Sequence, residues 1–451
     1  MLSNNGLASR TLTFILAGGQ GQRLHPLTRD RAKPAIPFGG RYRLIDFTLS
    51  NCLNSGFRRI NILTQYQCES LHSHVRALAL QIRRDQNCDE AFVCRCPISG
   101  KRYRGTADAV FQNLPIVQNS RADFVLILSG DHVYKMDYRE LLRSHVDHDA
   151  DVTVAGVEYP SNAASHFGIL ETDSKGSLVG FEEKPNKPKP ICADSSNSLV
   201  SMGVYVFNTR TLMDVLYDDA QQNTSHDFGK DIIPALIADR KVSVFNFTEM
   251  GVRQGPYWRD VGTLDAYYRV NMELLLSSFV DAYASASWPL WGLDRQVDSE
   301  FVRAEGRPSS GGVVVDSVVP ETVWIGSGAR VIHSVLSPSI QIENAAEVQN
   351  SILLQNIHVG AGARIQRAIL DENVRIGDGV EIGYDPNRDR EYGFVTESGI
   401  VVIPANTYVG PQRLSPPHAA WRTELIRNRS DQVPAERKNL SSRQQKSQGR
   451  H

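Results

Sequence analysis

Near its N-terminus, this 451-residue sequence lacks a basic segment followed by a long apolar core. The apolar stretch LTFILA is too short for a signal peptide or a membrane span. An excess of charge of one sign is also lacking, because 49 basic and 50 acidic residues leave a net charge of −1. These absences exclude a global attraction to nucleic acid or to an anionic membrane. We therefore expect a cytoplasmic protein that binds anions only at local sites.

Cysteine is scarce, with six residues, and no CxxC pair occurs. The common paired-cysteine motifs for zinc binding and thiol redox chemistry are therefore missing. Three of the cysteines crowd into CDEAFVCRC, residues 88–96, where a zinc or redox site is an alternative. We interpret the cysteines as reduced, partly buried thiols of an intracellular protein.

Two common nucleotide-binding motifs are missing from a glycine-rich turn near the N-terminus. The stretch FILAGGQGQRLHPLTRDRAKPAIPFGG, residues 14–40, starts with an apolar run that leads directly into glycines. Counted from Gly19, a dinucleotide fingerprint would need glycine where Leu24 stands, and no P-loop Lys-Ser/Thr pair follows. What remains is a turn in which Gly18, Gly19 and Gly21 let the backbone approach a phosphate closely.

Charged residues complete a candidate anion site. Arg23 and Lys33 follow the glycine turn and offer positive charge to a polyanionic leaving group. Asp131 comes directly after the apolar run of LILSGDH, and ligands of parallel sheets collect beyond the carboxyl ends of strands. Asp260, in PYWRDVGT, is a second acid. Two carboxylates that face a triphosphate would hold Mg²⁺.

Short apolar runs alternate with helical segments from about residue 10 to 275. ADFVLILSGD and ADVTVAGVEY have the continuous apolar character of buried strands, whereas YRELLRSHV has helical spacing. FGILETDSKGSLVGFEEKP is typical of a hairpin. This alternation predicts an α/β domain over 10–280 with a mixed, mostly parallel sheet covered on both faces.

After a Trp/Pro-containing connector, residues 281–307, aliphatic residues recur with a step of 17 residues. Three rows share this step, namely Ile325, Ile342, Val359 and Ile376; Val314, Val331, Val348, Ile365 and Ile382; and Val318, Val335, Ile352 and Ile369. Three stacks at one period predict a three-sided β-solenoid over 308–410, and its I/V-G pairs resemble the hexapeptide repeat of left-handed β-helices. Residues 411–451 are polar and rich in Pro, Arg and Gln, which predicts a flexible tail.

Several longer motifs occur together and in order. They are LAGGQGQRLHPLT, RAKPAIPFGGRYRLIDFTLSNCLNSG, YRGTADAV, SGDHVYKMDY, FEEKP, SMGVYVF, HDFGKDIIP and YWRDVGTLDAY. With this set the sequence resembles the bacterial ADP-glucose pyrophosphorylases (glucose-1-phosphate adenylyltransferases) from about residue 10 to 410. The resemblance implies a Rossmann-like nucleotidyltransferase domain followed by a left-handed parallel β-helix. It also implies transfer of the adenylyl group of ATP to α-D-glucose 1-phosphate, the committed step of bacterial glycogen synthesis.

The resemblance further implies a role for individual residues. ATP would be bound by Gly18, Gly19, Gly21, Arg23, Gln65, Tyr103, Gly105 and Thr106. Glucose 1-phosphate would be bound by Tyr103, Gly168, Glu183, Lys184 and Ser201. The catalytic residues would be Arg23, Lys33, Asp131 and Lys184, and the ligands of Mg²⁺ would be Asp131 and Asp260.

A homotetramer regulated by metabolites is also implied by the resemblance. Many bacterial relatives have a basic residue where Asp30 stands here, so the identity of the activator stays open. Two alternatives to the leading interpretation are a related sugar-nucleotide pyrophosphorylase with another base or sugar, and a non-catalytic regulatory subunit. A regulatory subunit would be expected to lose a metal acid, the loop arginine or the sugar-phosphate lysine, and all of these residues are present.

Overall fold

The computed structural model describes residues 4–86, 92–97, 102–247, 257–276, 288–293, 303–306 and 311–410. Met1–Val409 form one compact unit. The predicted tail, 411–451, and most of the predicted connector, 281–307, lie outside the described residues. Among the helices of the described ranges, none is long and apolar enough to cross a membrane.

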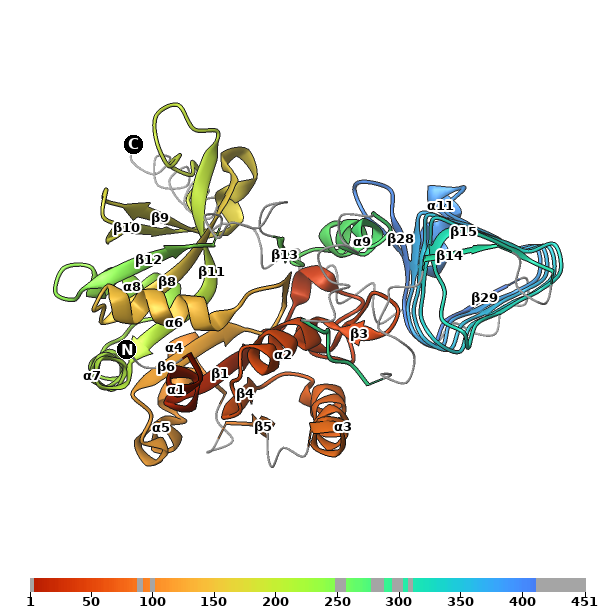
Figure 1. Ribbon diagram of the computed structural model, residues 1–451. Coiled ribbons are helices and arrows are strands. Elements are labelled where there is room, and N and C mark those ends of the chain that lie inside the picture. Colours follow the sequence, from red (N-terminus) through yellow and green to blue (C-terminus); the bar gives the residue numbers. More distant parts are fainter. Residues whose placement is uncertain are drawn as a thin grey trace, which may run out of the picture. The chain divides into compact units, whose positions relative to one another are not determined.

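A nine-stranded mixed sheet organises the N-terminal part of the chain (Figure 1). The strand order in this sheet is β10-β9-β11-β6-β1-β4-β5. In addition, β8 pairs with β11, and β12 pairs with β8. One half is parallel, because β1 pairs in parallel with β4 and β6, and β4 with β5. The strands of this half are β1 (Thr11–Ala17), β4 (Ile60–Thr64), β5 (Phe92–Arg95) and β6 (Phe124–Ser129).

The other half of the sheet is mainly antiparallel. β11 runs antiparallel to β6, β8 and β9, and β9 forms the predicted hairpin with β10. Its strands are β8 (Val152–Pro160), β9 (Gly168–Thr172), β10 (Leu178–Glu183), β11 (Asn197–Asn208) and β12 (Val242–Asn246). Two small ribbons pair β2 (Pro37–Phe38) with β3 (Tyr42–Arg43) and β7 (His132–Tyr134) with β13 (Trp258–Asp260).

Helices cover both faces of this sheet, as the apolar strands require. Neighbouring residues of β1 belong to different cores, with Ile15 in one and Phe14 in the other. The first core is closed by α2, α3 and α6, and the second by α4, α5 and α7. The helices are α1 (Asn4–Ser9), α2 (Leu44–Asn54), α3 (Cys68–Gln86), α4 (Thr106–Phe111), α5 (Leu114–Ser120), α6 (Tyr138–Asp147), α7 (Thr209–Ala220), α8 (Ile233–Leu236) and α9 (Leu264–Glu273). Four shorter helical turns are η1 (Gln22–Leu24), η2 (Lys33–Ala35), η3 (Ser161–His166) and η4 (Phe228–Ile232).

The C-terminal part is a parallel β-helix with three ladders of short strands (Figure 1). The first ladder contains β16 (Trp324–Ile325), β19 (Gln341–Ile342), β22 (His358–Val359), β25 (Arg375–Ile376) and β29 (Tyr408–Val409). The second contains β15 (Val313–Val318), β17 (Arg330–Ile332), β20 (Glu347–Gln349), β23 (Arg364–Gln366) and β26 (Glu381–Ile382). The third continues from β15 through β18 (Val335–Leu336), β21 (Ile352–Leu353), β24 (Ala368–Leu370) and β28 (Val401–Ile403). The remaining elements are β14 (Arg303–Gly306), β27 (Phe394–Val395) and α11 (Pro386–Tyr392).

The three predicted aliphatic rows are confirmed residue by residue. Ile325 pairs with Ile342, Val331 with Val348, and Val335 with Ile352, each 17 residues further on. Side chains of all three rows point into the β-helix or its adjoining core and are buried. The step lengthens once, where α11 is inserted in the last coil and β24 therefore pairs with β28.

The β-helix packs directly on the sheet domain through a shared apolar core. This core contains Leu44 and Phe47 from α2, Tyr267 from α9, and Val335 and Ile369 from the β-helix. Burying apolar surface from both parts removes it from water, which accounts for their behaviour as one compact unit.

Candidate active site

The glycine turn begins where β1 ends and is open at one position. Gly21 has φ +62, a left-handed conformation that glycine adopts without steric cost, and its carbonyl accepts a 3.0 Å hydrogen bond from Thr28 Oγ1. A Cβ added at Gly18 would lie 3.4 Å from Cβ of Gln65, so this position packs against the protein. A Cβ added at Gly19 would have no neighbour within 4 Å. The backbone at Gly19 is therefore accessible to a ligand.

Two acids from distant segments meet beyond β6. Asp131 lies two residues after the end of β6, and its carboxylate accepts a hydrogen bond from Ser129 Oγ. The β7–β13 ribbon sets Asp260 opposite His132. As a result, Nε2 of His132 lies 3.7 Å from carboxylate oxygens of both Asp131 and Asp260.

Lys33 joins the two acids. Its Nζ lies 2.8 Å from Oδ2 of Asp131 and 3.2 Å from Oδ1 of Asp260, and the lysine is almost fully buried. Burial by itself lowers the pKa of Lys33, but the two carboxylates outweigh it and hold the pKa above its usual value. Burial likewise raises the pKa of Asp131, but Lys33, His132 and Ser129 outweigh it and hold this pKa well below its usual range. Both groups are therefore charged at neutral pH.

Arg23 reaches the same place from η1. A Cβ added at Gly262 would lie 2.7 Å from Oδ2 of Asp260 and 3.1 Å from Nη2 of Arg23, so both groups border this glycine. The structure thus brings together Arg23, Lys33, Asp131 and Asp260, which the sequence predicted to share one site. This corner offers two cations and two carboxylates within a few ångströms.

Gln65 and Tyr103 form a contact at the side of the glycine turn. The Tyr103 amide donates a hydrogen bond to Oε1 of Gln65, whose Cβ packs against Gly18. The Tyr103 side chain is buried, and its hydroxyl accepts a 3.3 Å hydrogen bond from Nδ2 of Asn113. Burial raises the pKa of Tyr103, so its hydroxyl is neutral. In this arrangement Tyr103 orients Gln65 through its backbone.

Gly105 and Thr106 dock on the segment before η4. A Cβ added at Gly105 would lie only 2.2 Å from the carbonyl oxygen of His226, which leaves room for glycine alone. Thr106 Oγ1 donates to Oδ2 of Asp227 at 3.0 Å and accepts from the amide of Phe228 at 2.9 Å. These two residues therefore hold neighbouring segments together within the protein.

Three of the five residues expected to bind glucose 1-phosphate lie on the β9–β10 hairpin or directly after it, namely Gly168, Glu183 and Lys184. Gly168 pairs with Glu183, and a Cβ added at Gly168 or at Gly229 would lie 2.9 Å from Oε2 of Glu183. Lys184 follows in a left-handed conformation and donates a 2.6 Å hydrogen bond from Nζ to Oε1 of Glu183. Its side chain is 56% exposed, so the ammonium group is free to turn towards a ligand.

Ser201 lies at a register shift in β11, the central strand of this half. Its Oγ accepts a 3.3 Å hydrogen bond from the amide of Gly203 and is hydrogen-bonded to Tyr205. Tyr205 stacks on Phe228 with ring centroids 5.6 Å apart. Ser201 is therefore connected through Tyr205 to the segment around η4.

Sequence reasoning missed His132, Ser129 and Trp258. The Trp258 ring lies 5.1 Å from that of His132 and 5.3 Å from that of Phe167, between centroids, and so connects the acid corner with the residue before Gly168. Trp258 Nε1 and His132 Nδ1 are buried without a hydrogen-bond partner in the described part of the chain. SGDH and PYWRD contain these residues, but only the pairing of β7 with β13 reveals that they are neighbours.

A mixed sheet whose first strand ends in an open glycine turn, beside paired acids and paired cations, defines the nucleotidyltransferase class. In agreement, residues 12–277 match the family model "Nucleotidyl transferase", and residues 299–403 match "GlmU-like, C-terminal hexapeptide". The chain belongs to the glucose-1-phosphate adenylyltransferase family of nucleotidyltransferases.

Three relatives support the assignment to this family. The chain is 47% identical over 316 residues to glucose-1-phosphate adenylyltransferase 2 of Alkalilimnicola ehrlichii, covering 69% of this chain and 74% of the relative. It is 45% identical over 327 residues to the enzyme of Rhodopirellula baltica, covering 70% and 72%. It is 46% identical over 319 residues to that of Shewanella frigidimarina, covering 70% and 76%.

Proposed function

We propose that this protein transfers the adenylyl group of ATP to α-D-glucose 1-phosphate, giving ADP-glucose and pyrophosphate. This reaction is the committed step of bacterial glycogen synthesis. The observation that carries the proposal is the convergence of Arg23, Lys33, Asp131 and Asp260 next to the glycine turn, where a Cβ added at Gly21 would lie 3.1 Å from Cβ of Lys33. The names of the relatives supply the two substrates.

In this reaction a phosphate oxygen of glucose 1-phosphate attacks the α-phosphorus of ATP in line. A new P–O bond forms, and the bond between the α-phosphorus and the bridging oxygen breaks with release of pyrophosphate. Because the attacking oxygen is already anionic, the reaction needs no general base. Catalysis then consists of positioning the two substrates and neutralising charge on the transferring phosphoryl group.

The cationic residues are suited to this neutralisation. Arg23 and Lys33 would neutralise charge on the triphosphate of ATP, with Lys33 near the departing pyrophosphate. Lys184 would bind the phosphate of glucose 1-phosphate, and Glu183 a sugar hydroxyl. The exposure of Lys184 and its position on the β9–β10 hairpin next to Glu183 support this division.

We further propose that Asp131 and Asp260 hold Mg²⁺. Their carboxylate oxygens are hard donors of the kind that Mg²⁺ prefers, and Lys33 and His132 keep them close together. When bound, the ion supplies positive charge to the phosphate oxygens. The protein's own part is to hold the two carboxylates together and to keep Asp131 ionised, which the lowered pKa of Asp131 supports.

Regulation and assembly belong to the same proposal. Asp30 forms a 2.8 Å ion pair with Arg29, which reduces the positive charge that this segment offers an anionic effector. We infer that the activator differs from that of relatives with a basic residue at this position. We also propose that the protein assembles as a homotetramer, and the exposed aromatic side chains of Trp324 and Tyr408, each 45% exposed on one ladder of the β-helix, support self-association through this ladder.

The decisive experiment measures pyrophosphate release from purified protein with ATP and glucose 1-phosphate. A grid of other nucleoside triphosphates and sugar phosphates tests the alternative of a related pyrophosphorylase. We expect activity with ATP and glucose 1-phosphate, lost with EDTA and restored by Mg²⁺. Preference for another pair would assign a different substrate, and absence of release with every pair and metabolite would favour the regulatory-subunit alternative.

A further inference from the structure

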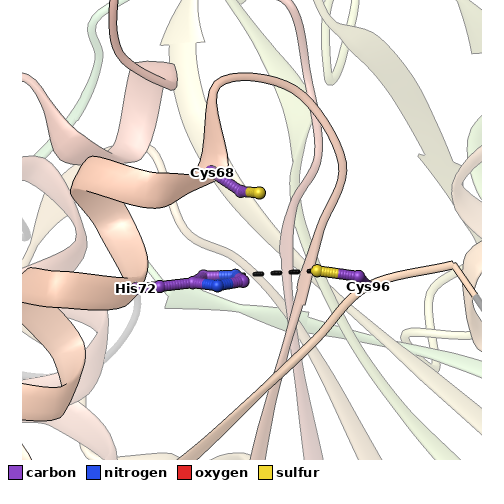
Figure 2. A group of neighbouring side chains, drawn as sticks. All are labelled: Cys68, His72 and Cys96. Atoms are coloured by element: carbon purple, nitrogen blue, oxygen red, sulfur yellow. Dashed lines mark hydrogen bonds between the residues drawn. The ribbon is translucent and has the colours of Figure 1, made fainter.

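Three metal-binding side chains meet at a place that the nucleotidyltransferase reaction does not use. Cys68 begins α3, His72 follows one helical turn later, and Cys96 lies directly after β5. Their donor atoms, two Sγ and one imidazole nitrogen, all lie within 4.8 Å of one another. Figure 2 shows the three side chains directed towards a common point between α3 and the segment after β5.

Local structure explains this meeting. On a helix, residues four apart share a face, so Cys68 and His72 present their side chains on the same side. The parallel pairing of β4 with β5 brings the chain after Arg95 next to Thr64. Cys96 therefore faces the start of α3, with its Sγ 3.9 Å from Nε2 of His72.

We propose that Cys68, His72 and Cys96 bind one Zn²⁺ ion, with a water molecule as the fourth ligand. Two thiolates and an imidazole form a donor set typical of zinc. In a tetrahedral site, Zn–S bonds of about 2.3 Å and Zn–N bonds of about 2.0 Å put sulfur and nitrogen about 3.5 Å apart and the two sulfurs about 3.8 Å apart. The 3.9 Å between His72 and Cys96 is already close to this value.

Binding needs only local exchanges. The hydroxyl of Thr64 lies 2.7 Å from Nε2 of His72 and 3.1 Å from the carbonyl oxygen of Arg95, so the hydroxyl can still donate to that carbonyl when the ion takes its place at Nε2. Coordination releases the two thiol protons of Cys68 and Cys96 to solvent.

A Cys68–Cys96 disulfide is the competing use of these thiols. It would need an external two-electron oxidant and would leave His72 without a role. The imidazole facing both sulfurs favours the ion instead.

The position of this cluster suggests what the ion does. Cys68 comes three residues after Gln65, and the amide of Tyr103, seven residues after Cys96, donates to Gln65. An ion that joins Cys68 to Cys96 would therefore tie together the two segments that meet beside Gly18. We infer a structural clamp at the edge of the nucleotide site, distinct from the hard oxygen donors of Asp131 and Asp260.

The test is a titration of the reduced full-length protein with Co²⁺, which replaces Zn²⁺ and is coloured in thiolate sites. We expect one equivalent to produce a thiolate-to-cobalt charge-transfer band and tetrahedral visible bands, and Zn²⁺ to displace them. Cys68→Ser, His72→Ala and Cys96→Ser should each lose these bands. Cys192→Ser, an exposed cysteine outside the cluster, is the matched control and should keep them.

Other measurements keep the outcome unambiguous. Each variant is compared with the parent by circular dichroism, and Zn²⁺ should raise the melting temperature of the parent and of Cys192→Ser only. Because the readout is a thiolate band, magnesium at the carboxylates and adenylyl transfer do not contribute to it. Bands that survive in all three folded variants, or a reduced parent protein that gives none, would overturn the proposal. Isolation of a Cys68–Cys96 disulfide from a protein that binds no metal when reduced would do so as well.

Discussion

Nζ of Lys33 lies 2.8 Å from Oδ2 of Asp131, although Lys33 begins η2 in the segment that follows β1 and Asp131 lies in the turn after β6. β1 and β6 are neighbouring parallel strands, so their carboxyl ends lie at one edge of the sheet. The lysine that follows the first strand therefore meets the acid that follows the second. This pair keeps a buried cation and a carboxylate ionised at the place where we propose that the triphosphate of ATP is bound.

Replacing the acid of this pair should mainly slow the chemical step. We expect Asp131→Asn to lower kcat by roughly 10²- to 10³-fold, the usual cost of one transition-state electrostatic contact, with a modest change in KM. The measurement is steady-state pyrophosphate release. Asp194→Asn, at an exposed acid, is the control and should behave like the parent. A normal kcat with a greatly raised KM would contradict the role given to Asp131.

Lys184 should affect the sugar phosphate rather than turnover. A charge-assisted hydrogen bond to phosphate is worth about 1.5–3 kcal/mol, so Lys184→Ala should raise KM for glucose 1-phosphate by about 10- to 100-fold. KM for ATP and kcat should change little. Lys189→Ala is a matched control, since Lys189 is also an exposed lysine paired with a glutamate. If both variants lose affinity equally, Lys184 has no specific contact with the substrate.

Substitution by alanine should have different effects at Gly19 and at Gly105. Gly19→Ala adds a methyl group to open space, so we expect an unchanged melting temperature and weaker ATP binding. Gly105→Ala would force a Cβ to within 2.2 Å of the His226 carbonyl, so we expect a loss of stability. Thermal melts and ATP titrations separate the two effects. If the Gly19→Ala variant binds ATP normally, the turn at Gly19 is not part of the nucleotide site.

The Lys33–Asp131 pair should give a defined dependence of stability on pH. Burial alone would raise the pKa of Asp131, but the effect of its neighbours, Lys33 first among them, is larger and lowers this pKa. The pKa of Asp131 in the folded protein therefore lies below its value in the unfolded chain. The ionised carboxylate therefore stabilises the fold above about pH 4, the unfolded-state pKa, and this contribution is lost as the pH falls below it. For Lys33, whose pKa is raised, the contribution is lost only at strongly alkaline pH.

Urea unfolding of the parent and of Asp131→Asn at several pH values measures this contribution. The difference between their free energies of unfolding should be constant from about pH 5 to 9 and shrink below about pH 4. A difference that grows in acid would show that Asp131 is easier to protonate in the folded protein than in the unfolded chain.

Much of the fold could be predicted because it depends on local repetition. A step of 17 residues sets one aliphatic side chain above another in each coil, and the observed pairs Val348–Ile365 and Ile352–Ile369 follow it. In the sheet domain, the apolar run before Gly18 predicted a buried strand, which is β1. The inserted α11 could not be predicted from the period, since it interrupts it.

Residue types and their order in the chain determined the α/β class, the β-helix and the set of charged residues predicted for the candidate active site. Only the tertiary structure decided which of them touch. Strand pairing joins β7 to β13 and β4 to β5, and so brings His132 beside Asp260 and Cys96 beside His72. The physical reason is that a repeat in the sequence predicts which side chains share a face within one helical turn or one coil. The contacts between His132 and Asp260 and between Cys96 and His72 depend instead on backbone hydrogen bonds between segments far apart in the chain.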